Sequence, residues 1–310
     1  MKRIVSRKLP LGEIKDAQPF HICMKGLEKA ILCRDDEDYG VMVKYIAVCA
    51  RRKNVIVIIY CVVSNHCHVA ILAATYEDAS AFAAELKRTY AQWFQIKYQE
   101  KQILKGVDIK ALFLDNDWYV RNTLAYIPLN ALDNGFPIDQ YRWSGYQAMF
   151  KVTKQPAKGL SVSKLSRRGQ DRVMHTRETL KDVPWLVDTE GDLIPETFCD
   201  TDYLEQAFNH DQAFWFKTIG AVNSAEMEEK LVDAPRRLLP DSELHKEVSD
   251  IALRWFSKQL SELTKENKKR LLPYLWRTRK TTIPQLARVL GLERDVVSRG
   301  IKIRKTGDGK

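Results

Sequence analysis

The chain has 310 residues, of which 45% are hydrophobic and 29% are charged. These proportions exclude a disordered or fibrous protein, and the length favours two domains because a single core rarely grows beyond ~250 residues. Fifty Lys and Arg side chains against 40 Asp and Glu side chains give a net charge of +10. This excess favours an anionic partner over an acidic metabolite.

The charge is distributed unevenly along the chain. The net charge is +4 over residues 1–150, +6 over 151–175, −10 over 176–263 and +10 over 264–310. We interpret these segments as a first domain, a basic linker, an acidic helical segment and a basic tail. The two most basic segments are either binding surfaces or ordinary solvated faces.

The six cysteines lie mostly inside apolar runs and form no Cys-x-x-Cys pair, which is typical of reduced, buried thiols in a cytoplasm. The longest apolar run, Val55–Val63, is too short to span a bilayer. Residues 1–8 lack the apolar segment of a signal peptide. We therefore expect a soluble cytoplasmic protein with no membrane partner.

Residues 1–150 alternate between strand and helix patterns. Strands are predicted over 20–24, 54–63, 66–72 and 109–114, helices over 39–52, 77–98 and 117–132, and a loop at the acidic residues 35–38. The order strand, helix, strand, strand, helix, strand is that of a ferredoxin-like split βαβ sheet, so the predicted class is α+β. Pro128 either kinks the last of these helices or marks an early end of it.

Two histidines stand two residues apart in the third predicted strand. Alternation along a strand sends His66 and His68 to one face and Cys67 to the other. Two neutral imidazoles on one face form half of a divalent-metal site. The alternative is a pair of surface histidines beside a turn, although the apolar runs on both sides are typical of a buried strand.

Tyr126 and Asn130 are separated by four residues in the predicted helix 117–132. This spacing stacks their side chains on one face of the helix. A single tyrosine in such a helix is most often a core aromatic. Asn130 is alternatively a helix cap ahead of the turn at residues 133–135.

Six blocks of sequence occur in order between residues 16 and 150. They are Phe20–Ile22, Arg34–Asp38, Tyr60–Val69, Leu86–Tyr90, Tyr126–Asn130 and Tyr141–Tyr146. Together they resemble the REP-associated tyrosine transposases, which belong to the single-tyrosine HUH superfamily. The family pattern reads roughly Met-Pro-Asn-His-Val-His-Leu, followed later by Tyr-Ile-x-x-Asn-Pro-Val-Arg-Ala-Gly.

The resemblance implies an enzyme of the bacterial cytoplasm or nucleoid that nicks and transfers single strands of hairpin-forming repeat DNA. His66, His68 and Asn130 would hold Mg²⁺ or Mn²⁺, which would polarise the scissile phosphate. Tyr126 would be the nucleophile and would form a 5′-phosphotyrosine. A hard cation suits an amide oxygen and a phosphate better than zinc does.

The chain departs from the family pattern at two places. Ala131 stands where the family usually has proline, and Leu132–Gly135 replaces the Arg-Ala-Gly tail. The Gly- and Arg-rich stretch before the fourth strand is shortened to Gly106–Lys110. These differences concern substrate recognition more than chemistry.

The C-terminal residues carry a second motif, after helical patterns over 176–263 and 247–275. Ala287, Gly291 and Val297 have the spacing of a helix-turn-helix. The recognition helix, predicted over 293–303, would present four side chains to a DNA groove: Arg294, Ser298, Arg299 and Lys302. The alternative is an ordinary helical hairpin.

Two other functions remain open at this point. The first is a domesticated regulator that binds repeat DNA and has little catalytic activity. The second is an RNA-binding module, because such modules share the predicted order of strands and helices. That module requires aromatic side chains on the two central strands, and Tyr60 alone is a weak match.

Overall fold

The computed structural model describes residues 3–25, 31–100, 107–151, 157–222, 224, 227, 241–278, 281 and 283–302. It divides the chain into two compact units, Met1–Met227 and Glu228–Lys310. The boundary between the units falls inside the predicted acidic segment 176–263 instead of at either of its ends. Within the described residues, no helix is long and apolar enough to cross a membrane.

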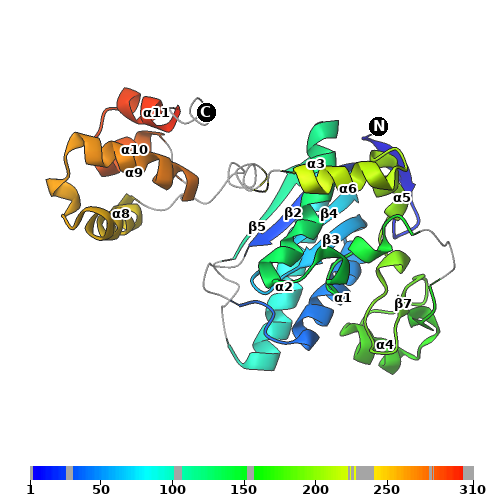
Figure 1. Cartoon of the computed structure of the whole chain (residues 1–310). Helices are drawn as coiled ribbons and strands as arrows, with labels where there is room; N and C mark the ends of the chain where they lie inside the picture. The colour runs from blue at the N-terminus through cyan, green and yellow to red at the C-terminus, as the bar shows by residue number, and fades with distance from the viewer. Residues whose placement is uncertain are drawn as a thin grey trace. The chain divides into compact units, whose positions relative to one another are not determined.

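The first unit is built on an antiparallel sheet (Figure 1). Its strands are β1 (Val5–Lys8), β2 (Ile14–Lys25), β3 (Ile56–Val62), β4 (His66–Ala73) and β5 (Asp108–Phe113). Strand β2 pairs with β4 along one edge, and along its other edge it pairs first with β1 and then with β5. Strand β3 pairs with the far edge of β4. The central strands are therefore β2 and β4.

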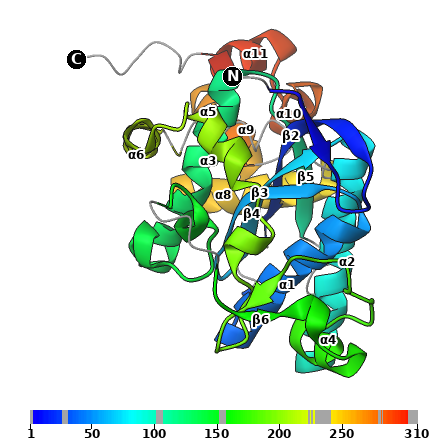
Figure 2. The ribbon, with the colours of Figure 1, turned by 90° about the vertical axis from the view of Figure 1, so that its right-hand side faces the viewer.

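Three helices cover this sheet: α1 (Asp36–Arg52), α2 (Tyr76–Tyr98) and α3 (Asp117–Leu129). The order β2, α1, β3, β4, α2, β5 is the predicted order, and the unit mixes helices and sheet as an α+β protein does. Figure 2 shows α1 and α2 on one side of the sheet and α3 on the other.

The acidic residues predicted to form a loop instead begin α1. Asp35 is the N-cap, and its Oδ1 accepts a hydrogen bond of 3.0 Å from the backbone N–H of Asp38. Asp36, Glu37 and Asp38 then occupy the first turn, where negative charge stabilises the helix dipole.

Helix α3 ends one residue after Pro128, and a 3₁₀ turn over Asn130–Asn134 follows it. Of the two alternatives for Pro128, the structure shows the early helix end. A proline so close to the C-terminus removes a single backbone hydrogen bond and leaves most of the helix regular. As a consequence, Asn130 is the C-cap residue of α3.

The predicted basic linker contains regular structure. A short strand, β6 (Leu160–Ser161), precedes helix α4 (Arg167–Met174), which packs against α1. The hydroxyl of Ser166 caps α4 by accepting from the backbone N–H of Gly169.

Residues 176–200 contain no α-helix, although a helical segment was predicted there. Strand β7 (Leu186–Val187) pairs with β6 instead. Pro184 and Pro195 lack the N–H that a helix requires, and Gly191 reverses the chain with a φ of +85°. Helices α5 (Thr201–Ala207) and α6 (Gln212–Ala221) follow.

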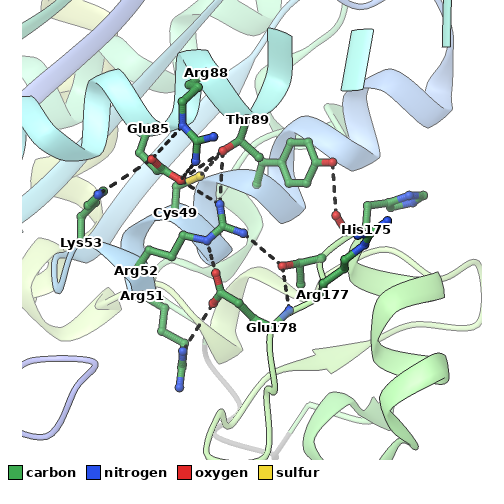
Figure 3. A network of polar contacts seen from close by, with 12 residues as sticks. Cys49, Arg51, Arg52, Lys53, Glu85, Arg88, Thr89, His175, Arg177 and Glu178 are labelled. Carbon is green, nitrogen blue, oxygen red and sulfur yellow. Dashed lines mark hydrogen bonds and ion pairs between the residues drawn. The ribbon is translucent and has the colours of Figure 1, made fainter. Parts of the chain in front are cut away.

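A cluster of charged and polar side chains connects residues 176–178 to α1 and α2 (Figure 3). We call it the Arg52 network; it comprises Arg51, Arg52, Glu85, Arg88, Thr89, Thr176 and Glu178. Arg52 donates to Glu85 at 2.9 Å, to Thr176 at 3.2 Å and also to Glu178. Arg88 donates to the same Glu85 carboxylate. The Glu85 and Glu178 carboxylates therefore accept hydrogen bonds from guanidinium groups, and these contacts stabilise the packing of the segment on α1 and α2.

The second unit contains four α-helices among its described residues. They are α8 (Asp241–Phe256), α9 (Lys265–Thr278), α10 (Ile283–Leu290) and α11 (Arg294–Lys302). The core includes Leu244 and Val248 of α8, so α8 belongs to the same folded body as the basic tail. Ala287 and Val297 are buried, and Gly291 adopts a φ of +62° at the turn between α10 and α11.

Candidate active site

The fold brings the four predicted site residues of the first unit together. His66 and His68 lie on β4, and their ring centroids are 4.9 Å apart. Tyr126 comes from α3, and its ring meets that of His68 edge-on at 5.3 Å. His66, His68, Tyr126 and Asn130 are all at most 9% exposed. The site therefore lies between the central sheet and α3.

Asn130 performs the capping role that was one of its two predicted alternatives. Its Nδ2 donates to the backbone carbonyls of Tyr126 and Ile127 at 3.1 and 3.0 Å. In these two hydrogen bonds, both N–H groups of the Asn130 amide donate to backbone carbonyls at the C-terminus of α3. They also fix the orientation of the amide, so that Oδ1 points away from the helix end.

The oxygen of Asn130 faces His66. Oδ1 lies 3.1 Å from His66 Nε2, while Nδ1 on the same ring lies 2.7 Å from Asn65 Oδ1. A carbonyl oxygen accepts, so His66 donates to Asn65 when its proton is on Nδ1 and to Asn130 when its proton is on Nε2. In the Nδ1–H form, a cation bound beside the two atoms would replace the proton that otherwise joins His66 Nε2 to Asn130 Oδ1.

A third histidine completes the cluster. His21 on β2 is fully buried, and its Nε2 lies 3.0 Å from Nδ1 of His68. Burial lowers the pKa of His21 to about 3, so its ring is neutral. The sequence alone indicates no role for His21. The signal it offered was a polar residue inside an apolar strand.

Strand register explains why His21 reaches His68. Cys23 is directly paired with His68, and His21 stands two residues from Cys23 on the same strand. Residues i and i+2 share a face, so His21 is a diagonal neighbour of His68 on the side of the sheet that α3 covers. Lys110 of β5 is paired with Cys23 and lies on this face as well.

The residues present fit a hard divalent cation. Two ligands at right angles around such an ion, each at ~2.1 Å, lie ~3.0 Å apart, close to the 3.1 Å between His66 Nε2 and Asn130 Oδ1. Within the described part of the chain, no three His, Cys, Asp or Glu side chains are grouped to hold a metal. The Asn130 amide oxygen would be a third protein ligand beside the two histidines.

The predicted DNA-contacting residues lie on α11 of the second unit. Arg294 and Arg299 are exposed, and Ser298 is half-buried. Lys302 is the last residue of α11, and its side chain lies outside the described part of the structure. Ile303, the predicted end of this helix, also lies outside the described residues.

The aromatic pattern of an RNA-binding sheet is not present among the described residues. Tyr60 lies on β3, an edge strand, where it is buried and stacked on Phe198. Phe20, on the central strand β2, is buried beside Phe113. Neither ring is exposed for stacking on a base, which removes the support for the RNA-binding alternative.

Comparisons with known proteins give one distant likeness. No protein-family model and no curated protein matches the chain. A solved structure of a REP-associated tyrosine transposase bound to a REP hairpin is similar over 50% of this chain and 87% of that one. The two chains are 13% identical, and the TM-score is 0.36. Function is therefore inferred from this chain's own side chains.

Proposed function

We propose that the first unit is a ferredoxin-like domain of the HUH type that nicks single-stranded DNA and transfers the cut strand. The antiparallel order β5-β2-β4-β3 supports this fold assignment. The observation that carries the function is the facing pair of His66 Nε2 and Asn130 Oδ1, placed beside a buried tyrosine. With the His66 proton on Nδ1, this nitrogen and this oxygen would be two ligand atoms for a cation.

Tyr126 is the proposed nucleophile. Its phenolic oxygen forms a bond to the scissile phosphorus, and the bond between phosphorus and the 3′ oxygen breaks. The products are a 5′-phosphotyrosine and a free 3′-OH, and the proton lost by Tyr126 is the one that this hydroxyl gains. The energy of the phosphodiester is kept in the protein–DNA bond, so a second strand can be joined without ATP.

His66, His68 and Asn130 are the proposed ligands of Mg²⁺ or Mn²⁺. When bound, the cation would stabilise negative charge on the non-bridging oxygens of the phosphate. The chain contributes rigidity: two ligands stand on a central strand, and the third is fixed by its hydrogen bonds to the end of α3. Lys110, on the same face of the sheet, adds positive charge for the DNA backbone.

The second unit is the proposed DNA-anchoring module. Its α10–α11 pair has a buried Ala287, a left-handed Gly291 and a buried Val297, the environments that a helix-turn-helix requires. Arg294 and Arg299 would contact DNA from α11. We infer hairpin-forming repeat DNA as the substrate, and a repeat-binding regulator without catalysis is the competing function.

The anchoring role is tested by removing residues 228–310, because a cut at residue 264 would divide the core that α8 shares with the tail. We expect weaker binding to hairpin DNA and a shallower salt dependence, by ~0.7–0.9 in slope for each lost phosphate contact. Unchanged affinity and slope would contradict the anchoring role.

Catalysis is tested by incubating the full chain with a labelled hairpin-bearing single strand and Mn²⁺. We expect a covalent protein–DNA adduct that is absent in Tyr126→Phe. Tyr119→Phe is the matched control, since Tyr119 is also buried and lies on the same helix. Salt-sensitive binding without any adduct would favour the regulator instead.

A further inference from the structure

His21 is placed where it can determine which nitrogen of His68 is available for binding. The two rings meet at 3.0 Å through His21 Nε2 and His68 Nδ1, with an angle of 35° between the ring planes. Both side chains are almost completely buried, so water does not compete for this contact. His21 stands on β2 and His68 on β4, the two central strands, and their separation is fixed by backbone pairing.

We propose that His21 is a positioning residue whose Nε2 accepts the Nδ1–H of His68, which leaves the Nε2 lone pair of His68 for a cation. This inference rests on the proposed function. A neutral imidazole carries one proton, so a cation on His68 Nε2 confines that proton to Nδ1. The acceptor at hydrogen-bond distance is His21 Nε2.

The same contact fixes the protonation of His21. If Nε2 of His21 accepts, its own proton is on Nδ1, an atom with no hydrogen-bond partner among the described residues. The His21 ring is therefore held by its contact with His68 and by packing against Tyr126, whose ring lies edge-on at 6.4 Å. Histidine ligands of metals usually donate their second N–H to an oxygen acceptor. In this protein the acceptor at that position is a nitrogen of His21.

Replacing His21 separates this role from simple packing. His21→Phe keeps a ring of similar size but removes the acceptor, and His21→Gln offers Oε1 near the position of Nε2. His175→Asn is the control, because His175 contacts Trp93 away from the site and asparagine tolerates its positive φ of 51°.

Mn²⁺ affinity of the full chain, measured by titration without DNA, is the first readout. We expect His21→Phe to raise Kd by ~10–100-fold, His21→Gln to restore it most of the way, and His175→Asn to leave it unchanged. If His21→Phe binds Mn²⁺ with the Kd of the wild type, the role of His21 is wrong but the proposed cation site still stands. No Mn²⁺ binding by the wild type, or equal binding by His66→Ala, would overturn the proposed cation site and the inference together.

Nitrogen-15 NMR of the Mg²⁺-loaded wild type is the second readout and does not depend on any variant folding. We expect the proton on His68 Nδ1, with a scalar coupling across the hydrogen bond to His21 Nε2. A proton on His68 Nε2 would overturn the inference. So would the absence of any proton between the rings, since a cation shared by both would leave none.

Discussion

The first unit holds two polar clusters, one partly exposed and one buried, that differ in how their groups are matched. In the Arg52 network, guanidinium groups meet carboxylates, and the Arg52 donors reach Glu85, Thr176 and Glu178. In the histidine cluster, an imidazole nitrogen faces an amide oxygen, and a buried ring nitrogen of His21 has no partner among the described residues. Matched charges stabilise a fold, whereas an imidazole nitrogen beside an amide oxygen is the pairing that we propose for a cation site.

The two clusters also differ in which parts of the chain they join. The Arg52 network connects α1 to a segment 126 residues further along that contains no α-helix. The histidine cluster is built entirely on the central strands and α3. Rigid elements are the better support for ligands that must keep their geometry.

The largest effect should come from His66→Ala or His68→Ala. Either change removes a cation ligand, and the loss of several kcal/mol of charge stabilisation corresponds to ~10³-fold slower nicking. Binding of hairpin DNA should change little, because contacts from Lys and Arg to phosphates dominate affinity. The rate of strand cleavage and the Kd for DNA are the two measurements. Nicking at the wild-type rate in the presence of a chelator would be incompatible with the metal role.

Arg52→Met should produce the opposite pattern. It leaves Glu85 and Glu178 without their shared guanidinium, and we expect the free energy of unfolding to fall by about 2 kcal/mol. Nicking below the unfolding transition should remain within about twofold of wild type, since Arg52 is no part of the histidine cluster. Denaturant titration measures the first effect and a cleavage assay the second.

Arg88→Met is the matched control for this change, because Arg88 contacts the same carboxylate from an exposed position. An exposed pair contributes ~0.2–1 kcal/mol, so the control should destabilise the fold less than Arg52→Met does. Equal losses in the two variants would show that Arg52 is not the centre of the network.

Asn130 both caps α3 and contacts His66, so its replacement should affect both stability and Mn²⁺-dependent nicking. Asn130→Ala removes the cap on α3 and the amide oxygen, so we expect a loss of ~1 kcal/mol in unfolding free energy and roughly tenfold more Mn²⁺ for half-maximal nicking. Asn130→Asp should bind Mn²⁺ more tightly and turn over more slowly, because a carboxylate neutralises more of the cation's charge. An unaltered Mn²⁺ titration with lower thermal stability in the alanine variant would reduce Asn130 to a cap.

The smallest expected effect is a pH dependence of stability at Glu85. Burial raises the pKa of Glu85, but hydrogen bonds from Arg88 and Arg52 outweigh burial and hold the pKa below its usual 4.5. A lowered pKa in the folded state stabilises the fold above pH 4.5, and this contribution is lost as the pH falls further. The difference in unfolding free energy between wild type and Glu85→Gln should therefore shrink below pH 4.5. A constant difference down to about pH 3 would contradict the assignment.

The sequence was sufficient for the local part of the site. The His-x-His spacing on a strand and the four-residue spacing of Tyr126 and Asn130 on a helix follow from periodicity alone, and the fold brings these residues together. The α+β class and the order of the elements were predictable for the same reason. The hydrophobic periodicity that predicts a helix or a strand can be recognised within a short stretch of sequence.

The rest depends on contacts between distant segments. No residue near His21 in the sequence has a spacing that indicates a shared site. Its position beside His68 follows from the register of β2 against β4. Glu178 and Arg52 are 126 residues apart, and no local pattern connects them. The helical segment predicted over residues 176–263 is wrong at 176–200, where Pro184 and Pro195 lack the N–H that a helix requires.

The central claim is that His66 Nε2 and Asn130 Oδ1 face each other to hold a cation. Anomalous diffraction from crystals of the full chain soaked in Mn²⁺ tests it most directly. We predict an anomalous peak within bonding distance of His66, His68 and Asn130, and no peak in His66→Ala crystals. A cluster without a peak, in which His66 carries a second proton and donates it to Asn130, would contradict the claim.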